Sequence, residues 1–291
     1  QGLIINESDP IELRANVTDN VGVNEVWANV SWDGGNGWNY VELNRYNTTD
    51  IFNRTFANTS WIGVYNFTIY ANDSVGNLND TESGSFEVRD STPPVINSHN
   101  ATPNSTAYNS NITIFANVTD NVAVLNVSVA IEGVNYSMHP PVGAVYSYAF
   151  NTTAYPVGVY NYTIYANDTS TPNNLAVPQT GNFTIEQTYS TLELYLNGTQ
   201  GNFSVDEDLS VNLTAVLFRP LLGELVQVYV NGSVAANSSS PAVNLTAFEP
   251  GYYNITAVYV GNVNYSGSRV SYVLEVNDTT RPNVTSLSPL P

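Results

Sequence analysis

Aspartates are the residues of this sequence whose type and spacing come nearest to metal chemistry. They stand beside expected turns at Asp19, Asp73, Asp120 and Asp168, and at expected linkers at Asp90 and Asp278. Such carboxylates can bind Ca²⁺ and stiffen a domain junction, or they can close turns by accepting hydrogen bonds from nearby N–H groups. The acids are spread singly, without an Asp-x-Asp cluster, so turn closure is the favoured interpretation. No metal ligand is assigned and no cofactor is expected, with Ca²⁺ kept as the alternative.

Other chemistries lack their residues. The only imidazoles are His99 and His139 and there is no cysteine, so zinc clusters, cysteine nucleophiles and most catalytic triads have no components. No glycine-rich phosphate-binding motif is present, and we expect no enzyme activity. A formal charge of −18 with no lysine disfavours nucleic acid as a partner. No apolar stretch reaches the length of a membrane span.

Asparagine side chains offer a different chemistry, covalent glycosylation. About 29 Asn-x-Ser/Thr sequons occur. In many of them the middle residue is apolar and expected to face inward, so that the Asn before it and the Thr after it both lie on the exposed face of the strand. The predicted N-glycan sites are Asn16, Asn29, Asn66, Asn72, Asn111, Asn117, Asn126, Asn161, Asn182, Asn212, Asn244, Asn254 and Asn283. The alternative is that Asn and Thr only decorate exposed strands. Glycans would explain solubility with 11% charged residues.

Internal repeats define the organisation that must position these residues. The segment 15–21, Ala-Asn-Val-Thr-Asp-Asn-Val, recurs at 116–122, and the block from Gly63 returns from Gly158 and more loosely from Gly251. Proline and small polar residues mark the boundaries. We therefore predict domains at 1–89, 90–187 and 188–277, followed by a linker and strand at 278–291.

The strand pattern favours an all-β fold. In residues 11–18 apolar and polar side chains alternate, as in a half-buried strand. The Gly-x-Tyr-x-aromatic blocks at Gly63 and Gly158 resemble the immunoglobulin-like repeat domains of bacterial and archaeal surface proteins. That resemblance implies three tandem β-sandwiches, with Tyr65 and Tyr160 at the place of the tyrosine corner and an apolar core instead of a disulfide.

The two ends of the sequence are complementary. Residues 278–291 align without a gap on residues 90–103, the expected opening strand of the second domain, and the first domain has too few residues before Ala15 for such a strand. We expect the tail to complete the next unit, with Pro282, Val284, Leu287 and Pro291 in the assembly strand. Separate subunits and one long tandem chain both fit, and the competing interpretation is a plain truncation with a disordered tail.

These patterns predict a structural subunit or repeat of an N-glycosylated extracellular filament or surface stalk, on an archaeal cell by preference. Its partners would be identical subunits or adjacent repeats, joined head-to-tail. The alternative is a cell-surface adhesin or carbohydrate-binding module. In that case Trp32 and Trp38, which flank a glycine-rich loop, would contact the ligand or a neighbouring subunit, although packing is the commoner role of tryptophan.

Overall fold

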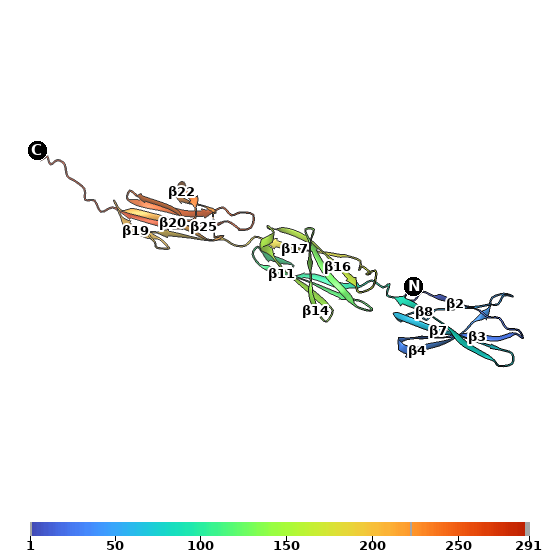
Figure 1. Cartoon of the computed structure of the whole chain (residues 1–291). Helices are drawn as coiled ribbons and strands as arrows, with labels where there is room; N and C mark the ends of the chain where they lie inside the picture. The colour runs from blue at the N-terminus through green and yellow to red at the C-terminus, as the bar shows by residue number, and fades with distance from the viewer. Residues whose placement is uncertain (1, 222, 289–291) are drawn as a thin grey trace. The chain divides into compact units, whose positions relative to one another are not determined.

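The chain folds into three immunoglobulin-like β-sandwiches, as the repeats predict. The computed structural model describes residues 2–221 and 223–288, and its regular structure is almost entirely β-strand (Figure 1). Two short 3-10 turns, η1 (Asp33–Gly35) and η2 (Thr152–Ala154), are the helical elements of the described part. Among these residues no helix has the length and apolar character needed to cross a membrane.

The first sandwich pairs a five-stranded sheet with a three-stranded one. The larger sheet has the order β1 (Leu3–Asn6), β8 (Leu78–Arg89), β7 (Gly63–Asp73), β3 (Val23–Trp32), β4 (Gly37–Glu42), and the smaller has β2 (Ile11–Asn16), β6 (Ile51–Phe56), β5 (Asn44–Arg45). The first strand, β1, runs parallel to the last, β8, and the other pairs are antiparallel.

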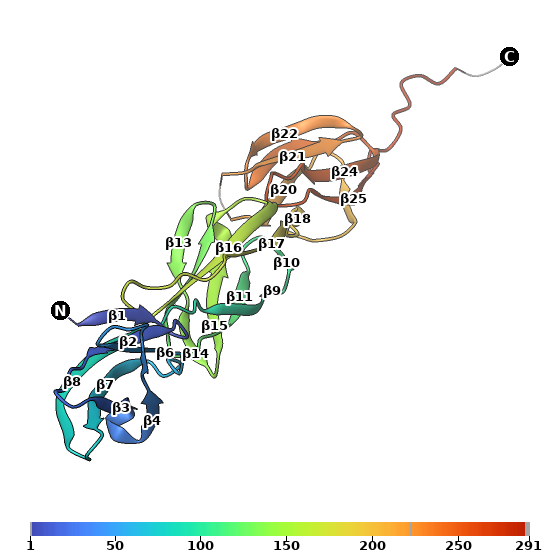
Figure 2. The ribbon, with the colours of Figure 1, turned by 90° about the vertical axis from the view of Figure 1, so that its right-hand side faces the viewer.

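The middle sandwich repeats this plan with one strand more in the smaller sheet. The larger sheet has the order β10 (Ser105–Ala107), β17 (Gln179–Glu186), β16 (Gly158–Asp168), β12 (Val124–Ile131), β13 (Val134–Ser137). The smaller has β14 (His139–Val142), β15 (Val145–Asn151), β11 (Asn111–Thr119), β9 (Val95–Thr102) (Figure 2). Strand β9 therefore occupies the edge beside β11.

The third sandwich also has a strand at that edge. Its larger sheet has the order β19 (Phe203–Asp206), β25 (Ser268–Asn277), β24 (Gly251–Tyr259), β21 (Leu225–Val230), β22 (Ser233–Ser239), and its smaller sheet has β18 (Thr191–Leu196), β20 (Ser210–Arg219), β23 (Ala242–Ala247). Strand β18 pairs antiparallel with β20.

The alternating pattern read from the sequence is the cause of this layering. Successive side chains of a strand point to opposite faces, so every second residue can enter the space between the sheets. In β11 the residues Ile112, Ile114 and Ala116 are fully buried, and in β20 so are Val211 and Leu213. Each sandwich thus has an apolar core without a disulfide.

Three tyrosines fix the corner before the long central strand of each larger sheet. The Tyr65 hydroxyl accepts a hydrogen bond from the backbone N–H of Trp61, four residues upstream. The hydroxyls of Tyr160 and Tyr253 instead donate to carbonyl oxygens four residues upstream, at 2.7 and 2.9 Å. The expected tyrosine corners at Tyr65 and Tyr160 are confirmed, and the third repeat has one too.

The first sandwich differs from the others at one edge. Among the described residues β2 pairs with β6 alone, whereas its counterparts β11 and β20 have strands on both sides. The exposed side of β2 also leaves the core less covered, since Ile11 is 8% exposed where its counterpart Ile112 is 0%. Residues 278–288 form no strand in the chain by itself.

Candidate functional site

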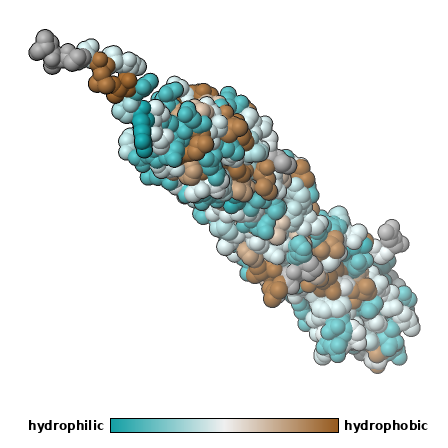
Figure 3. All heavy atoms as spheres, turned by 90° about the vertical axis from the view of Figure 1, so that its left-hand side faces the viewer, coloured by the Kyte–Doolittle hydropathy of each residue, from teal (hydrophilic) through white to brown (hydrophobic). Residues whose placement is uncertain are grey.

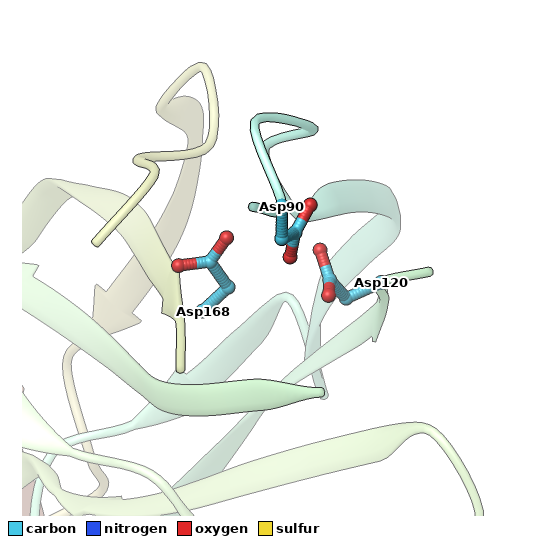
Figure 4. Close-up of side chains that lie close together, drawn as sticks. All are labelled: Asp90, Asp120 and Asp168. Carbon is cyan, nitrogen blue, oxygen red and sulfur yellow. The ribbon is translucent and has the colours of Figure 1, made fainter. Parts of the chain in front are cut away.

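Three aspartates that are distant in sequence meet at one point. Asp90 directly follows β8, Asp120 directly follows β11, and Asp168 is the last residue of β16. One carboxylate oxygen of each lies within 4.8 Å of the other two. Figure 4 shows the three carboxyl groups facing one another from three separate segments. Sequence reasoning named all three residues but gave no sign that they come together.

Backbone N–H groups hold two of these carboxylates by one oxygen each. Oδ1 of Asp120 accepts hydrogen bonds from Val122 N and Ala123 N, both at 2.9 Å. Oδ1 of Asp90 accepts one from Thr92 N at 3.0 Å and one from the Asn121 side-chain amide at 3.3 Å. These are the turn-closing bonds that aspartate makes readily, and they fix the direction of the second oxygen.

Asp168 is the most enclosed member. It is 0% exposed, and its Oδ1 accepts hydrogen bonds from Ser170 N, Ser170 Oγ and Asn174 N at 2.6–3.1 Å. Its Oδ2 accepts one from Asn174 Nδ2 at 2.7 Å. Burial acts to raise the pKa of Asp168, but the hydrogen bonds from Ser170 and Asn174 outweigh it, so the pKa is lowered. The carboxyl group is therefore held in its charged form.

The second oxygens of the other two aspartates have no partner. Asp90 Oδ2 and Asp120 Oδ2 are buried and make no hydrogen bond in the described part of the chain, and Asp90 as a whole is only 9% exposed. The ion pairs found among the described residues, Arg45–Asp50 and Arg89–Glu87, do not involve the cluster. Three carboxylates are thus gathered with no cationic side chain paired to them.

The first sandwich contains the same two turns without the third carboxylate. Oδ1 of Asp19 accepts from Val21 N and Gly22 N, both at 2.8 Å, and these bonds lower the pKa of Asp19. Oδ1 of Asp73 accepts from Val75 N and Asn77 N, both at 2.9 Å. Burial acts to raise the pKa of Asp73, yet the bonds from Asn77 and Val75 leave it lowered.

Two linkers are held in the same way. After the first sandwich, Glu7 accepts hydrogen bonds from the Thr92 hydroxyl and the Asn121 amide. After the third sandwich, Glu207 Oε1 accepts from Thr279 N at 2.7 Å and from the Thr280 hydroxyl at 2.7 Å. Asp278 Oδ1 accepts from Thr280 N at 3.0 Å, as Asp90 does from Thr92 N. The segment that begins at Asp278 therefore starts with the local structure of the segment that begins at Asp90.

The predicted glycan sites lie at the surface or partly exposed. Nine are exposed, namely Asn16, Asn66, Asn111, Asn126, Asn161, Asn182, Asn212, Asn254 and Asn283, and four are half-buried, namely Asn29, Asn72, Asn117 and Asn244. Asn244 is the least suitable, because its Nδ2, the atom that would carry the glycan, donates to Ala235 O at 2.8 Å.

The predicted assembly residues are uncovered as far as they are described. Val284 and Leu287 are 73% and 91% exposed, Pro282 is exposed, and Pro291 lies outside the described residues. Figure 3 shows a group of hydrophobic residues in this tail, beside residues of intermediate and hydrophilic character. The tail in one chain thus offers apolar side chains without a core to enter.

The two predicted tryptophans have different environments. Trp32 packs on the first core, 5.3 Å from the Tyr65 ring, and covers Gly37, where an added Cβ would lie 2.2 Å from the indole. Trp38 is 66% exposed.

Sequence reasoning missed an aromatic row on the outer face of the same sheet. Trp27 stacks between Tyr70 and Tyr40, with ring centroids 5.3 and 6.2 Å away. Its signal was present, because Trp27 alternates with the buried residues Val26 and Ala28.

Comparison with known proteins gives a likeness of general fold only. No family model matches the chain, and no curated protein matches it. Among solved structures, a tetra-tandem repeat from the extending region of a large adhesion protein is 16% identical with a TM-score of 0.42, covering 93% of this chain and 71% of that one. Titin domains I67–I69 are 11% identical with a TM-score of 0.40, covering 96% of both chains.

Proposed function

We propose that this chain is a structural subunit or repeat of an extracellular filament or surface stalk, joined head-to-tail by β-strand complementation. In this proposal residues 282–288 of one unit add to the open edge of β2 in the next unit. The donor is either a separate copy or the preceding repeat of a longer chain. No step of this function requires catalysis.

The likeness of the two linkers is the observation that carries the proposal. The segment that starts at Asp90 is anchored through Thr92 to Glu7, and it continues into β9, the strand that flanks β11. The segment that starts at Asp278 is anchored through Thr280 to Glu207. Because the two segments begin with the same local structure, we expect them to continue alike. The segment from Asp278 would then also form a strand at the edge of the sandwich that follows it.

The side chains of the tail suit that place. Counting from Asp90 and Asp278, Pro282, Val284 and Leu287 fall on the positions of Pro94, Ile96 and His99. Those three residues of the middle sandwich are buried or half-buried, while their neighbours Val95, Asn97 and Ser98 are exposed. Full burial of a Val or Leu side chain contributes about 1.5–3 kcal/mol, so half-burial of Val284 and Leu287 would contribute about half of that for each.

The open edge of β2 can accept such a strand. An edge strand presents a row of unpaired N–H and C=O groups, which a further strand can satisfy. Both Ile11 beside that edge and its counterpart Ile112, in a strand that β9 flanks, are buried, but Ile11 is 8% exposed and Ile112 is 0% exposed. One added strand would therefore supply both hydrogen bonds and cover for the core.

The surface is compatible with an extracellular, N-glycosylated chain. None of the thirteen predicted asparagines is fully buried, and glycans on strand faces would limit uncontrolled edge pairing. Dense N-glycosylation without cysteine favours an archaeal cell surface as the source. Intact-mass measurement of the natural protein tests this part, and a mass equal to that of the bare chain would exclude it.

Electron microscopy of the purified full chain tests the assembly. We expect linear fibres, and we expect the double substitution V284E and L287E to leave single particles, because two charges cannot enter the core beside β2. The control is V177E, which alters a side chain of similar exposure, 77%, outside the tail. Single particles for the unaltered chain, or fibres from the double variant, would contradict the proposal.

A surface adhesin or carbohydrate-binding module is the second candidate, favoured by the aromatic row of Trp27, Tyr40 and Tyr70. Stacked aromatic side chains on an exposed sheet face can pack against sugar rings. Glycan-array binding that is lost in W27A and retained in V177E would support this function. Absence of binding to any glycan would remove it.

A further inference from the structure

We propose that Asp90, Asp120 and Asp168 bind a Ca²⁺ ion where the second sandwich begins. The inference does not depend on the proposed assembly, because all three residues lie in one copy of the chain. It also goes beyond turn closure, the role that the sequence favours for these aspartates.

Two unpartnered oxygens point to a ligand independently of the clustering. A buried polar atom without a hydrogen bond is unfavourable by about 1–3 kcal/mol, and more when it is charged. Asp90 is 9% exposed, and its Oδ2 is buried without a partner. Asp120 is half-buried as a residue, but its Oδ2 is likewise a buried atom without a partner. In both residues Oδ1 is already held by backbone N–H groups. The two remaining oxygens are thus fixed in direction and left for a cation.

The absence of a nearby cationic side chain among the described residues also favours a bound cation. One carboxylate oxygen of each of the three aspartates lies within 4.8 Å of the other two, and carboxylates gathered in this way attract a cation. The chain has no lysine, and Arg89 is engaged with Glu87 and with the carbonyl of Thr171. The amides of Asn121 and Asn174 donate to Asp90 and Asp168, but they are neutral. No described side chain supplies the positive charge.

The donor atoms select among metals. All three side chains offer carboxylate oxygens, which suit hard cations, and the chain has no cysteine for a thiolate site. Mg²⁺ demands a tighter octahedral shell at about 2.0–2.1 Å, whereas Ca²⁺ accepts irregular arrangements of six to eight oxygens at about 2.3–2.6 Å. Three carboxylates from three separate segments of the chain fit the more tolerant ion. We expect a Kd of about 0.1–1 mM, the range of extracellular calcium modules.

Calorimetric titration of the full chain with CaCl₂, after dialysis against EDTA, tests the site. D120N keeps an oxygen for the bonds from Val122 N and Ala123 N but removes one ligand charge, so the Kd should rise about tenfold or more. D19N is the matched control, because Asp19 makes the same two backbone bonds in the first sandwich. It should leave the Kd unchanged.

Thermal unfolding gives a second readout with opposite signs. In EDTA, D120N should melt higher than the unaltered chain, because it relieves repulsion among the three carboxylates. In CaCl₂ at about 100 times the Kd it should melt lower, because the unaltered chain gains the binding free energy. Heat of binding that is absent, or equal in D120N and the unaltered chain, would overturn the proposal. The proposal would also be overturned if D120N changed the melting temperature in the same direction in EDTA and in CaCl₂. That result is expected if Asp120 only closes a turn.

Discussion

The ends of the first and second sandwiches share two aspartate turns but differ in one carboxylate. Asp19 and Asp120 accept the same pair of backbone hydrogen bonds, and Asp73 and Asp168 close the same kind of turn. Within the part of the chain that the structure describes, a linker residue brings a third carboxylate to them in the second sandwich alone, and that residue is Asp90. The difference teaches that the turn aspartates are shared by the first two sandwiches, and that the linker residue completes the cluster proposed to bind Ca²⁺.

The third sandwich extends this comparison. Its linker begins with Asp278, which is placed by Thr280 and Glu207 as Asp90 is by Thr92 and Glu7. Among the described residues, Asp278 has no turn aspartates beside it, and Asp19 and Asp73 have no linker aspartate beside them. Head-to-tail assembly would bring the two together.

Removing the buried turn aspartate should give the largest difference between the two regions. D168A leaves the N–H groups of Ser170 and Asn174 without an acceptor in a buried place, which destabilises the middle sandwich by about 2–4 kcal/mol. D73A should have a clearly smaller effect, since water can reach its turn. Hydrogen-exchange mass spectrometry of residues 168–174 and 73–77 measures both, and equal loss of protection would refute the distinction.

Removing the linker carboxylate should make the second region behave as the first. D90N keeps an acceptor for Thr92 N and removes one ligand charge, so Ca²⁺ affinity should fall about tenfold, equivalent to about 1.4 kcal/mol. Calorimetry measures the change. A D90N chain that binds Ca²⁺ with unchanged affinity would show that the linker does not create the site.

Supplying the missing linker carboxylate should make the first region behave as the second. In two copies joined in frame, residue 291 to residue 1, Asp278 of the first copy is expected beside Asp19 and Asp73 of the second. The fusion should bind one more Ca²⁺ than two separate copies at low concentration, and D278N in the first copy should abolish the gain. This prediction rests on both proposals. A fusion that binds no additional Ca²⁺ would show that the linkers beginning at Asp90 and Asp278 are not equivalent.

Local patterns were enough to predict the sandwiches. Alternation in residues 11–18 predicted strand β2 and its buried face, because alternation depends on neighbours within a few residues. The corners at Tyr65 and Tyr160 were implied by the resemblance to immunoglobulin-like repeats, which the Gly-x-Tyr blocks carry. The meeting of Asp90, Asp120 and Asp168 could not be read in this way. It depends on where three strands end in space, which spacing along the chain does not encode.

The aromatic residues show the same limit. The glycine-rich loop favoured Trp32 and Trp38 as contact residues, but Trp32 packs on the core. The stacked aromatic row forms around Trp27 instead, on another face. The partners of Trp27 lie on β4 and β7, and their register across β3 is a tertiary property. Sequence could place Trp27 on the outward side of a strand but could not name its neighbours.

A directed disulfide tests head-to-tail strand addition most directly, because the chain has no cysteine of its own. In the middle sandwich the Asn97 amide of β9 lies 3.1 Å from Asn117 Oδ1 of β11. The equivalent residues in an assembled pair are Thr285 of the donor and Asn16 of the acceptor, and strand addition should place them side by side on adjacent strands, as a disulfide requires. A T285C chain mixed with an N16C chain carrying ¹⁵N should form the mixed disulfide under mild oxidation.

The control is N53C, on β6 at the other side of β2, where Asn53 pairs with Arg14. Mass spectrometry of the oxidised mixture should find the peptide pair that links residues 285 and 16 in high yield, and little of the pair that links 285 and 53. A yield that is equal for the two acceptor positions, or absent for both, would contradict strand addition at β2.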